Sequence, residues 1–436
     1  MKPQLDATTE STFADDEDGA ISVVNLFFLL AVGMLAGVAI DVSSLVSARS
    51  QLQVTADAAA HAALVEREWS DADISKAKAV SLVSANMPPA RFGTVLADDN
   101  IQFGDYDRAT GTFTKDDDSR DAVLVQTHRL TSNGNPVSSF LLQLVGLWDW
   151  DVRTTSVFET FYPTCLIEGF VAMGVVDIQS NNSYFNGFCI HSNTHVEINQ
   201  NNFFEAGTVV SMPDTNDLVV PNNGLDDEKN EGLSDALREG KWFIKILDRL
   251  DRIVAGVQDE DSRYARDFTT NFEVVSMSKK TVDPSDFTAG RIYHFPCNNR
   301  LTFNAGVYED IVVISDCKIF IKSAEFHDVV IITKDTGSKA IDSSSNVVMG
   351  RADNCGPGGG AQFISYGTVN FSAKLEMHGS QIIAAGDVEF AANADGIRGA
   401  SIVAGGRVDG TSNMNFAFCG AGMGHVFTAE YFRMAE

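Results

Sequence analysis

Two six-residue runs in the C-terminal half decide the fold: residues 310–315 read DIVVIS, and residues 328–333 read DVVIIT. Both runs place one acid, four apolar residues and one hydroxyl residue in the same order, at an offset of 18 residues. Three later segments also match one another, at offsets of 19 and 20: residues 362–369, 381–388 and 401–408. Each begins with a polar residue and two apolar residues, and each has a glycine and a valine at the same positions. The C-terminal half therefore consists of repeated units of about 20 residues.

The same period begins earlier in the chain. Residues 176–178 (VDI) recur as residues 196–198 (VEI), and Asn181-Asn182 recurs as Asn201-Asn202. These short apolar strands predict a parallel β-helix, because each coil buries little alone and coils stacked about 4.8 Å apart build a continuous core. We expect the asparagines to stack as ladders at the bends, in a solenoid of about eight or nine coils. An antiparallel sandwich, the alternative, does not give near-constant offsets with matched glycines.

Residues 222–286 interrupt this repeat. Apolar residues recur there at helical spacing, with acids and bases between them: Leu237, Phe243, Ile244, Leu247, Leu250 and Val254. The pattern predicts an amphipathic helical insertion, which either caps the solenoid or binds a partner. The insertion separates the first solenoid coils, at 164–221, from the main β-solenoid, at 287–425. A C-terminal tail follows at 426–436.

The N-terminal region contains a candidate membrane span. Residues 20–40 carry no charge, and 21 helical residues at about 1.5 Å each reach about 30 Å, enough to cross a bilayer. The preceding residues are acidic, whereas a cleavable signal peptide has a basic n-region. We therefore expect a retained transmembrane helix at 19–41 after a cytoplasmic acidic tail at 1–18. A buried helix of a soluble protein is the alternative.

Residues 42–88 continue as an extracytoplasmic helix with no obvious break before Pro88, and residues 89–163 are typical of a small α+β unit. Small residues on the helices predict close packing: Gly33, Gly37, Ala56, Ala59 and Ala63. Gly33 and Gly37 form a GxxxG pair, which lets helix backbones touch. The alanines pack either on the helix's own domain or on a second copy in a homo-oligomer.

All six cysteines follow residue 164. An even set confined to one region indicates disulfides and an oxidising compartment, which puts the C-terminal domain outside the cytoplasm. Cys297 and Cys317 lie one coil apart, within the Cα separation that a disulfide tolerates. The remaining candidates are Cys165 with Cys189 and Cys355 with Cys419. Zinc is the alternative, but no pair has CxxC spacing.

The chain has a net charge of −27, which argues against nucleic acid as a partner. Acids lie at predicted coil edges, as in β-helices that cleave acidic polysaccharides: Asp310, Asp328, Asp387, Glu389 and Asp409. A lyase also needs a cation to stabilise the developing enolate, and only Arg407 lies close to the later acids. His191 and His195 have the i, i+4 spacing of a metal pair only if the segment is helical. We expect no catalytic residues, no metal and no cofactor.

The N-terminal third resembles the TadG-like proteins of bacterial Flp (Tad) pilus systems. The matching residues are Asp18-Gly19-Ala20, Ile40-Asp41, Leu52-Gln53, Asp57-Ala58-Ala59-Ala60 and Phe103-Gly104-Asp105-Tyr106-Asp107, within about 15–160. The C-terminal half resembles solenoid-like extensions of some members.

The resemblance implies a single-pass protein of a Gram-negative inner membrane, with a periplasmic scaffold or docking rod and other pilus-assembly components as partners. Related minor pilins carry glutamate at the fifth position after a processed glycine, where this chain has Val24, so we expect the span to be kept. A β-helix surface protein that binds or cleaves polysaccharide, or an adhesin, is the alternative function.

Overall fold

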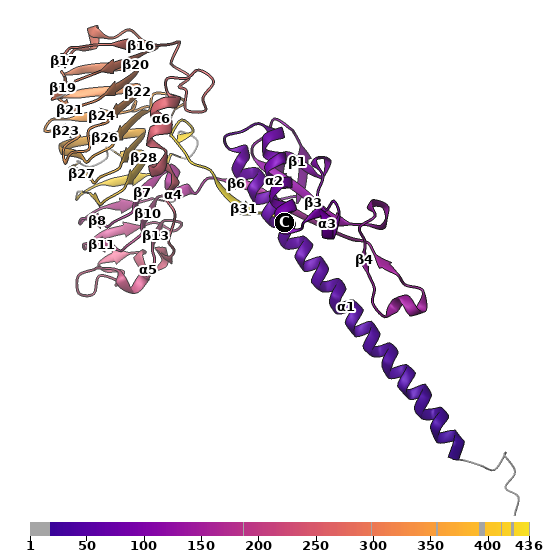
Figure 1. Ribbon diagram of the computed structural model, residues 1–436. Coiled ribbons are helices and arrows are strands. Elements are labelled where there is room, and N and C mark those ends of the chain that lie inside the picture. The colour runs from indigo at the N-terminus through magenta and orange to yellow at the C-terminus, as the bar shows by residue number, and fades with distance from the viewer. Residues whose placement is uncertain are drawn as a thin grey trace, which may run out of the picture. The chain divides into compact units, whose positions relative to one another are not determined.

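The computed structural model describes residues 18–185, 187–297, 299–354, 356–391, 397–410, 412–419 and 423–435. The chain forms two compact units, Met1–Phe161 with Glu430–Glu436, and Tyr162–Ala429. Each unit has its own buried core. The first unit contains the long apolar helix, and the second unit is a parallel β-solenoid (Figure 1).

Two helices and a five-stranded antiparallel sheet make up the first unit. Helix α1 (Asp18–Arg67) packs on a sheet of strand order β2-β1-β3-β6-β31, and α2 (Ala72–Asn86) packs on α1. The strands are β1 (Ile101–Asp107), β2 (Thr112–Lys115), β3 (Ala122–Arg129), β6 (Val152–Phe161) and β31 (Tyr431–Met434). Helix α1 changes character along its length, because its apolar residues are exposed over 21–35 and alternate with buried ones only from Leu52 onward.

The prediction of an unbroken helix up to Pro88 is wrong. Helix α1 ends at Arg67, and α2 begins after Asp71, whose carboxylate accepts the N–H of Ile74 at 3.0 Å. An N-cap aspartate satisfies a backbone donor that the first helical turn leaves without a partner. The predicted C-terminal tail also contains a strand, because β31 pairs with β6 and places Tyr431 opposite Phe161.

The second unit is a parallel solenoid of about 12 turns, more than the eight or nine coils expected. Its longest ladder, among the described residues, runs through strands of eleven coils. In spatial order these are β16 (Asn271–Ser276), β18 (Arg291–Phe295), β20 (Gly306–Ser315), β22 (Ala324–Thr333), β25 (Ala361–Ser365), β26 (Val369–Ala384), β28 (Ile397–Ala404), β7 (Gly169–Ala172), β10 (Cys189–Ser192), β13 (Val209–Met212) and β15 (Leu237–Glu239). The predicted fold class, an N-terminal apolar helix before a mainly-β solenoid, is confirmed.

The stacking order differs from the chain order. The chain starts the solenoid at β7 and winds to β15 at one end, and a connection containing α6 (Leu250–Gly256) leads to β16 at the other end. It then winds back to β28, which pairs with β7 through Ser401 opposite Gly169 and Ala404 opposite Ala172. We call this junction, where the last coil meets the first, the closing seam.

The predicted helical insertion at 222–286 is wrong in most of its length. Helical turns occur at α5 (Leu233–Ala236), η5 (Lys245–Arg249) and α6, but β14 (Asn230–Glu231), β15, β16 and β17 (Thr281–Val282) join the solenoid ladders. Residues 271–276 read NFEVVS, a β-branched run that suits a strand. These additional strands account for the larger number of turns.

The repeats found in the sequence give the observed register. Ile311 lies opposite Val329, Val176 opposite Val196, and Gln381 opposite both Gln362 and Ser401. The asparagine ladder is also present: the carboxamide of Asn202 accepts the N–H of Asn182 at 2.9 Å. It extends to Asn230, which accepts the N–H of Asn202 at 3.0 Å.

Candidate functional site

A row of carboxylates follows one face of the solenoid. The strands of this face are β23 (Ile341–Ser343), β26, β27 (Val388–Ala391), β29 (Val408–Asp409), β8 (Val176–Ile178) and β11 (Val196–Ile198). Each contributes a partly exposed polar residue in register with the next: Asp342, Asn370, Glu389, Asp409, Asp177 and Glu197. We call these six residues the acidic column. Neighbouring strands lie about 4.8 Å apart, so their like charges repel unless a cation separates them.

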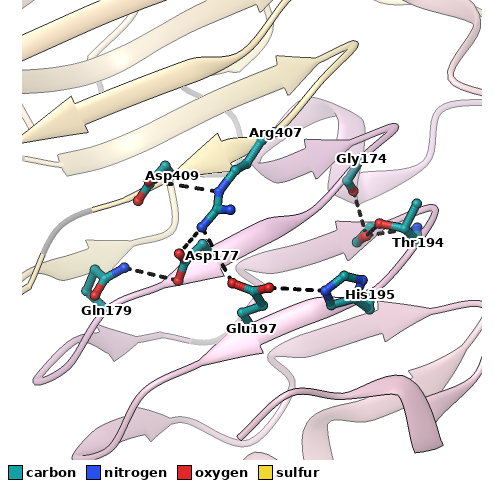
Figure 2. A network of polar contacts seen from close by, with 9 residues as sticks. Gly174, Asp177, Gln179, Thr194, His195, Glu197, Arg407 and Asp409 are labelled. Carbon is teal, nitrogen blue, oxygen red and sulfur yellow. Dashed lines mark hydrogen bonds and ion pairs between the residues drawn. The ribbon is translucent and has the colours of Figure 1, made fainter.

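Arg407 supplies that positive charge at the closing seam. Its guanidinium Nη2 contacts Asp177 Oδ2 and lies 3.5 Å from Glu197 Oε2, and Nε lies 3.9 Å from Asp409 Oδ2 (Figure 2). Arg407 and Asp409 belong to the last coil, whereas Asp177 and Glu197 belong to the first two. One side chain thus connects both sides of the seam.

The other members of the network also have neutral or basic partners. Gln179 donates to Asp177 Oδ1 at 3.0 Å, and His195 Nε2 lies 3.2 Å from Glu197 Oε1 (Figure 2). Asn370 donates to Glu389 at 2.6 Å. These contacts fix the orientation of the carboxylates along the column.

Burial and neighbouring charge alter the acidity of two members. Partial burial raises the pKa of Asp177, the carboxylate of Glu197 raises it further, and Arg407 opposes both effects. Partial burial likewise raises the pKa of Asp409, with Asp177 and Glu389 adding to the shift and Arg407 opposing it. Asp177 and Asp409 therefore hold their protons more readily than isolated aspartates do.

The structure distributes the predicted acids over two faces. Glu389 and Asp409 stack as expected, and Asp387 accepts the N–H of Arg407 at 2.7 Å. Asp310 and Asp328 lie instead at a corner of the other sheet, in the left-handed region with φ of 54° and 52°. Asp328 accepts the N–H of Gly359 at 2.7 Å.

A base near the corner acids was missed. Arg351 Nη2 lies 3.6 Å from Asp328 Oδ2, whereas the sequence indicated a base only near the later acids. Arg351 contacts Asp328 from the loop that follows β24 (Val347–Met349). Sequence spacing along one coil does not reveal a contact made by the next.

The two histidines do not converge on a metal position. His191 is buried, its Nδ1 lies 2.7 Å from Ser211 Oγ and its Nε2 lies 3.0 Å from Asn193 Oδ1. Its ring stacks on Trp242 at 4.4 Å, and burial lowers its pKa. Over the part of the chain that the structure describes, no group of three or more His, Cys, Asp or Glu side chains is arranged to hold a metal ion.

Two predicted disulfides are confirmed. Cys297 and Cys317 are bonded with Cα atoms 5.5 Å apart, and Cys165 and Cys189 with Cα atoms 4.9 Å apart. The third predicted pair joins Cys419 to Cys355, and Cys355 lies outside the described residues.

The small residues of α1 have different surroundings. The alanines at 56, 59 and 63 are fully buried within the first unit, on the side where the helix meets the sheet. There Thr127 Oγ1 donates to the carbonyl of Leu52 at 3.1 Å, and Gln53 donates to the carbonyl of Thr155 at 3.0 Å. This face therefore packs on its own domain, the first of the two alternatives. Gly33 and Gly37 lie in the exposed apolar part, with Gly37 covered and Gly33 open.

The closing seam could have been found from the sequence. Residues 401–409 read SIVAGGRVD and residues 169–177 read GFVAMGVVD, so five positions are identical and the apolar second position is shared. The similarity of coils far apart in the chain indicates that they can stack on each other as neighbours do. Asp177 and Glu197 would then have been placed in the same column as Asp409.

The fold and the apolar helix define a solenoid protein with one candidate membrane-spanning segment, because α1 contains one stretch that is long and apolar enough to cross a bilayer. The chain belongs to the family described as Domain of unknown function (DUF7867), whose model matches residues 169–420. A second family model, the TadE/G-like family of Flp pilus assembly, matches residues 19–72 and confirms the resemblance found in the sequence. No curated protein and no solved structure matches the chain.

Proposed function

We propose that this protein is a structural, non-enzymatic component of a Flp pilus-assembly system, anchored in the inner membrane of a Gram-negative bacterium with its solenoid in the periplasm. The observation that carries the proposal is the match of residues 19–72 to the TadE/G-like family. The matched segment contains the exposed apolar part of α1 and the buried alanine face that packs on the sheet. One helix thus joins a candidate anchor to a folded domain.

The disulfides support the compartment. Both described bridges lie in the solenoid unit, and stable disulfides are typical of the periplasm and other oxidising compartments. The net charge of −27 suits an exported rod that has to stay soluble, and disfavours binding to anionic lipid or nucleic acid.

The contacts of Arg407 support a non-enzymatic role for the acidic column. A β-helix lyase needs a cation directed at the substrate carboxylate, whereas the Arg407 side chain is shared among Asp177, Glu197 and Asp409. The guanidinium is therefore neutralised by carboxylates of the protein itself and is not directed at a substrate. We expect single substitutions in the acidic column to leave pilus function intact.

The sheet of the first unit suggests a clean truncation. Phe161 and Tyr431 lie opposite each other in the β6–β31 pair, so a short hairpin turn can replace residues 162–430. We expect this variant to insert into the membrane and fold, but to lose pilus display and in-cell crosslinks to pilus components. The full-length Arg407→Gln protein is the matched control and should retain both. Unchanged piliation in the truncated variant would contradict a scaffold role. A glycan-cleaving activity that the wild-type protein shows and the Arg407→Gln protein lacks would favour a polysaccharide-cleaving enzyme.

A further inference from the structure

A short hairpin of the first unit carries an apolar loop beside the candidate membrane span. Strands β4 (Val137–Ser138) and β5 (Asp149–Trp150) pair, and the loop between them contains the 3-10 helix η3 (Leu142–Val145). Residues 140–148 read FLLQLVGLW. Leu144 is 82% exposed and Trp148 is 62% exposed, and three other large apolar side chains there are more than half exposed: Phe140, Val145 and Leu147. Contiguous exposed apolar groups of this kind mark an interaction surface.

Asp41 fixes this loop to α1 at the end of the apolar stretch. The residue is 2% exposed, and its carboxylate accepts the backbone N–H groups of Phe140, Leu141 and Leu142 at 2.6, 2.9 and 2.6 Å. Three charge-assisted bonds to consecutive donors hold the start of the loop rigidly. The hairpin is therefore attached where the helix would leave the hydrocarbon region.

From Asp41 the loop extends back along the apolar part of the helix. A Cβ built on Gly37 would lie 3.0 Å from Leu141 Cβ, whereas one built on Gly33 would have no atom within 4 Å. An apolar cavity of about 460 Å³ lies between helix and loop, lined on the helix by residues 29–38 and on the loop by Leu141, Leu142, Leu144 and Val145. Leu29 precedes Asp41 by 12 residues, so the loop and its cavity extend roughly 18 Å along the helix axis at about 1.5 Å per residue.

Most backbone N–H groups of the loop have an acceptor within the protein, as hydrocarbon requires. Besides the three N–H groups that Asp41 accepts, Ser139 donates to the carbonyl of Trp148 at 2.8 Å. Leu144 donates to Leu141, Gly146 to Gln143 and Leu147 to Leu142, each at 3.1 Å. The side chain of Gln143 also donates to the carbonyl of Phe140 at 2.6 Å. Unsatisfied backbone polar groups are costly in the bilayer core, and these bonds lower that cost for the loop.

We propose that residues 140–148 form a second membrane-inserted element, a loop that enters one leaflet beside α1 and is covered by lipid acyl chains. The loop continues the lipid-facing surface of the helix, and its polar base at Ser138 and Asp149, joined at 3.1 Å, lies at the level of the headgroups. Trp148 is then an interfacial anchor of the kind that aromatic belts provide. The inference depends on α1 being a membrane anchor and is independent of the pilus role.

Site-specific fluorescence on the full-length protein in lipid vesicles tests the proposal. One environment-sensitive probe is attached at Leu144→Cys, and the control carries the same probe at Ala109→Cys in the exposed β1–β2 turn. The probe at position 144 should emit at a shorter wavelength than the control and should be quenched by iodide several-fold less. It should also be quenched by spin labels on the lipid acyl chains. Iodide quenching equal to that at position 109 would overturn the proposal. Protection from iodide without quenching by lipid labels would also overturn it, because a second copy would then cover the loop.

Three further variants distinguish a wrong assignment of the anchor from a wrong placement of the loop. Leu35→Cys reports on α1 itself, and an aqueous signal there would refute the anchor and the loop together. Gly37→Leu should displace Leu141 and raise iodide quenching of the probe at position 144, whereas Gly33→Leu, whose Cβ meets no neighbouring atom within 4 Å, should change it much less. Equal effects of the two glycine variants would contradict the packing of the loop on the helix.

Discussion

The step from β20 to β22 and the step from β28 to β7 are both parallel ladders, but the chain makes them in different ways. β20 and β22 are separated by 18 residues and pair along their whole length, from Gly306 opposite Ala324 to Ser315 opposite Thr333. β28 and β7 pair over four positions, and 232 residues separate Ser401 from Gly169. Closing the longer loop costs about 2 kcal/mol more, because the entropy cost grows as (3/2)RT ln n.

Side-chain contacts across the seam offset this cost. Phe170, Phe188 and Tyr184 of the first coil pack around Phe416 of the last, with ring centroids 4.8–5.3 Å from Phe416. Asn182 Oδ1 accepts the N–H of Met414 at 3.0 Å, so the asparagine ladder continues across the seam. The comparison teaches that the side-chain contacts which join consecutive coils also join coils that are far apart in the chain.

The largest expected effect comes from opening the aromatic cluster at the seam. Phe170→Ala removes a buried ring that touches both sides and should destabilise the protein by about 3–5 kcal/mol. We expect faster amide hydrogen exchange over residues 169–239 than elsewhere. Phe326→Ala, in the continuously wound part, is the control and should cost a similar amount without selective exchange of these coils. Uniform exchange in both variants would show that the seam is no weaker than an ordinary step.

Removal of the Cys297–Cys317 bridge is expected to have the next largest effect. This disulfide joins adjacent coils near the β16 end, 20 residues apart in the chain. Replacing both cysteines with serine should lower the free energy of unfolding by about 2–4 kcal/mol, measured by chemical denaturation. The aromatic cluster of the seam lies on other coils, so the rate of exchange over residues 169–239 should not change. Selective opening of the seam in this variant would contradict the independence of the two regions.

The asparagine ladder offers a smaller test. Asn202→Ala leaves the N–H of Asn182 buried without its acceptor, at a cost of about 1–3 kcal/mol. Asn201→Gly at the adjacent corner is the control, because Asn201 has a φ of 64° and glycine adopts that conformation without strain. Denaturant midpoints should fall for the first variant and stay close to wild type for the second. Equal midpoints would mean that water replaces the missing acceptor.

The smallest effect concerns Arg407, whose ion pairs are partly exposed. Arg407→Gln should cost about 0.5–1 kcal/mol at neutral pH. The pKa values of Asp177 and Asp409 are raised in the folded protein, so the folded state binds protons more tightly than the unfolded state. The contribution of these groups to stability is therefore highest at acidic pH and decreases as pH rises from their ordinary pKa through the raised folded value.

Loss of Arg407 should raise both pKa values further and move this decrease to higher pH. Denaturation of wild type and variant over a pH series measures the shift, and Asp409→Asn in the variant background should reverse part of it. Superimposable pH profiles of wild type and Arg407→Gln would mean that the guanidinium does not stabilise the charged column.

The parts of the fold that the sequence predicted are those set by local repetition. The register of β20 with β22, the asparagine ladder and the Cys297–Cys317 bridge all follow from offsets near one coil. The seam and β31 depend on pairing between distant segments, which a period along the chain does not encode. The contact of Arg351 with Asp328 comes from a loop of the next coil, whose path the repeat does not specify. The acidic column was half predicted for the same reason, since Glu389 and Asp409 lie on one side of the seam and Asp177 and Glu197 on the other.

The position of the seam also has a consequence for how such proteins diversify. Both connections of the solenoid unit to the first unit, at residues 161–162 and 429–430, leave near the coils that form the seam and not at an end of the stack. Duplication of a coil in either arm, β10 to β15 or β16 to β26, would lengthen the rod while leaving its attachment unchanged. A solenoid wound in this way can therefore be lengthened in two directions independently, without a change to the seam coils.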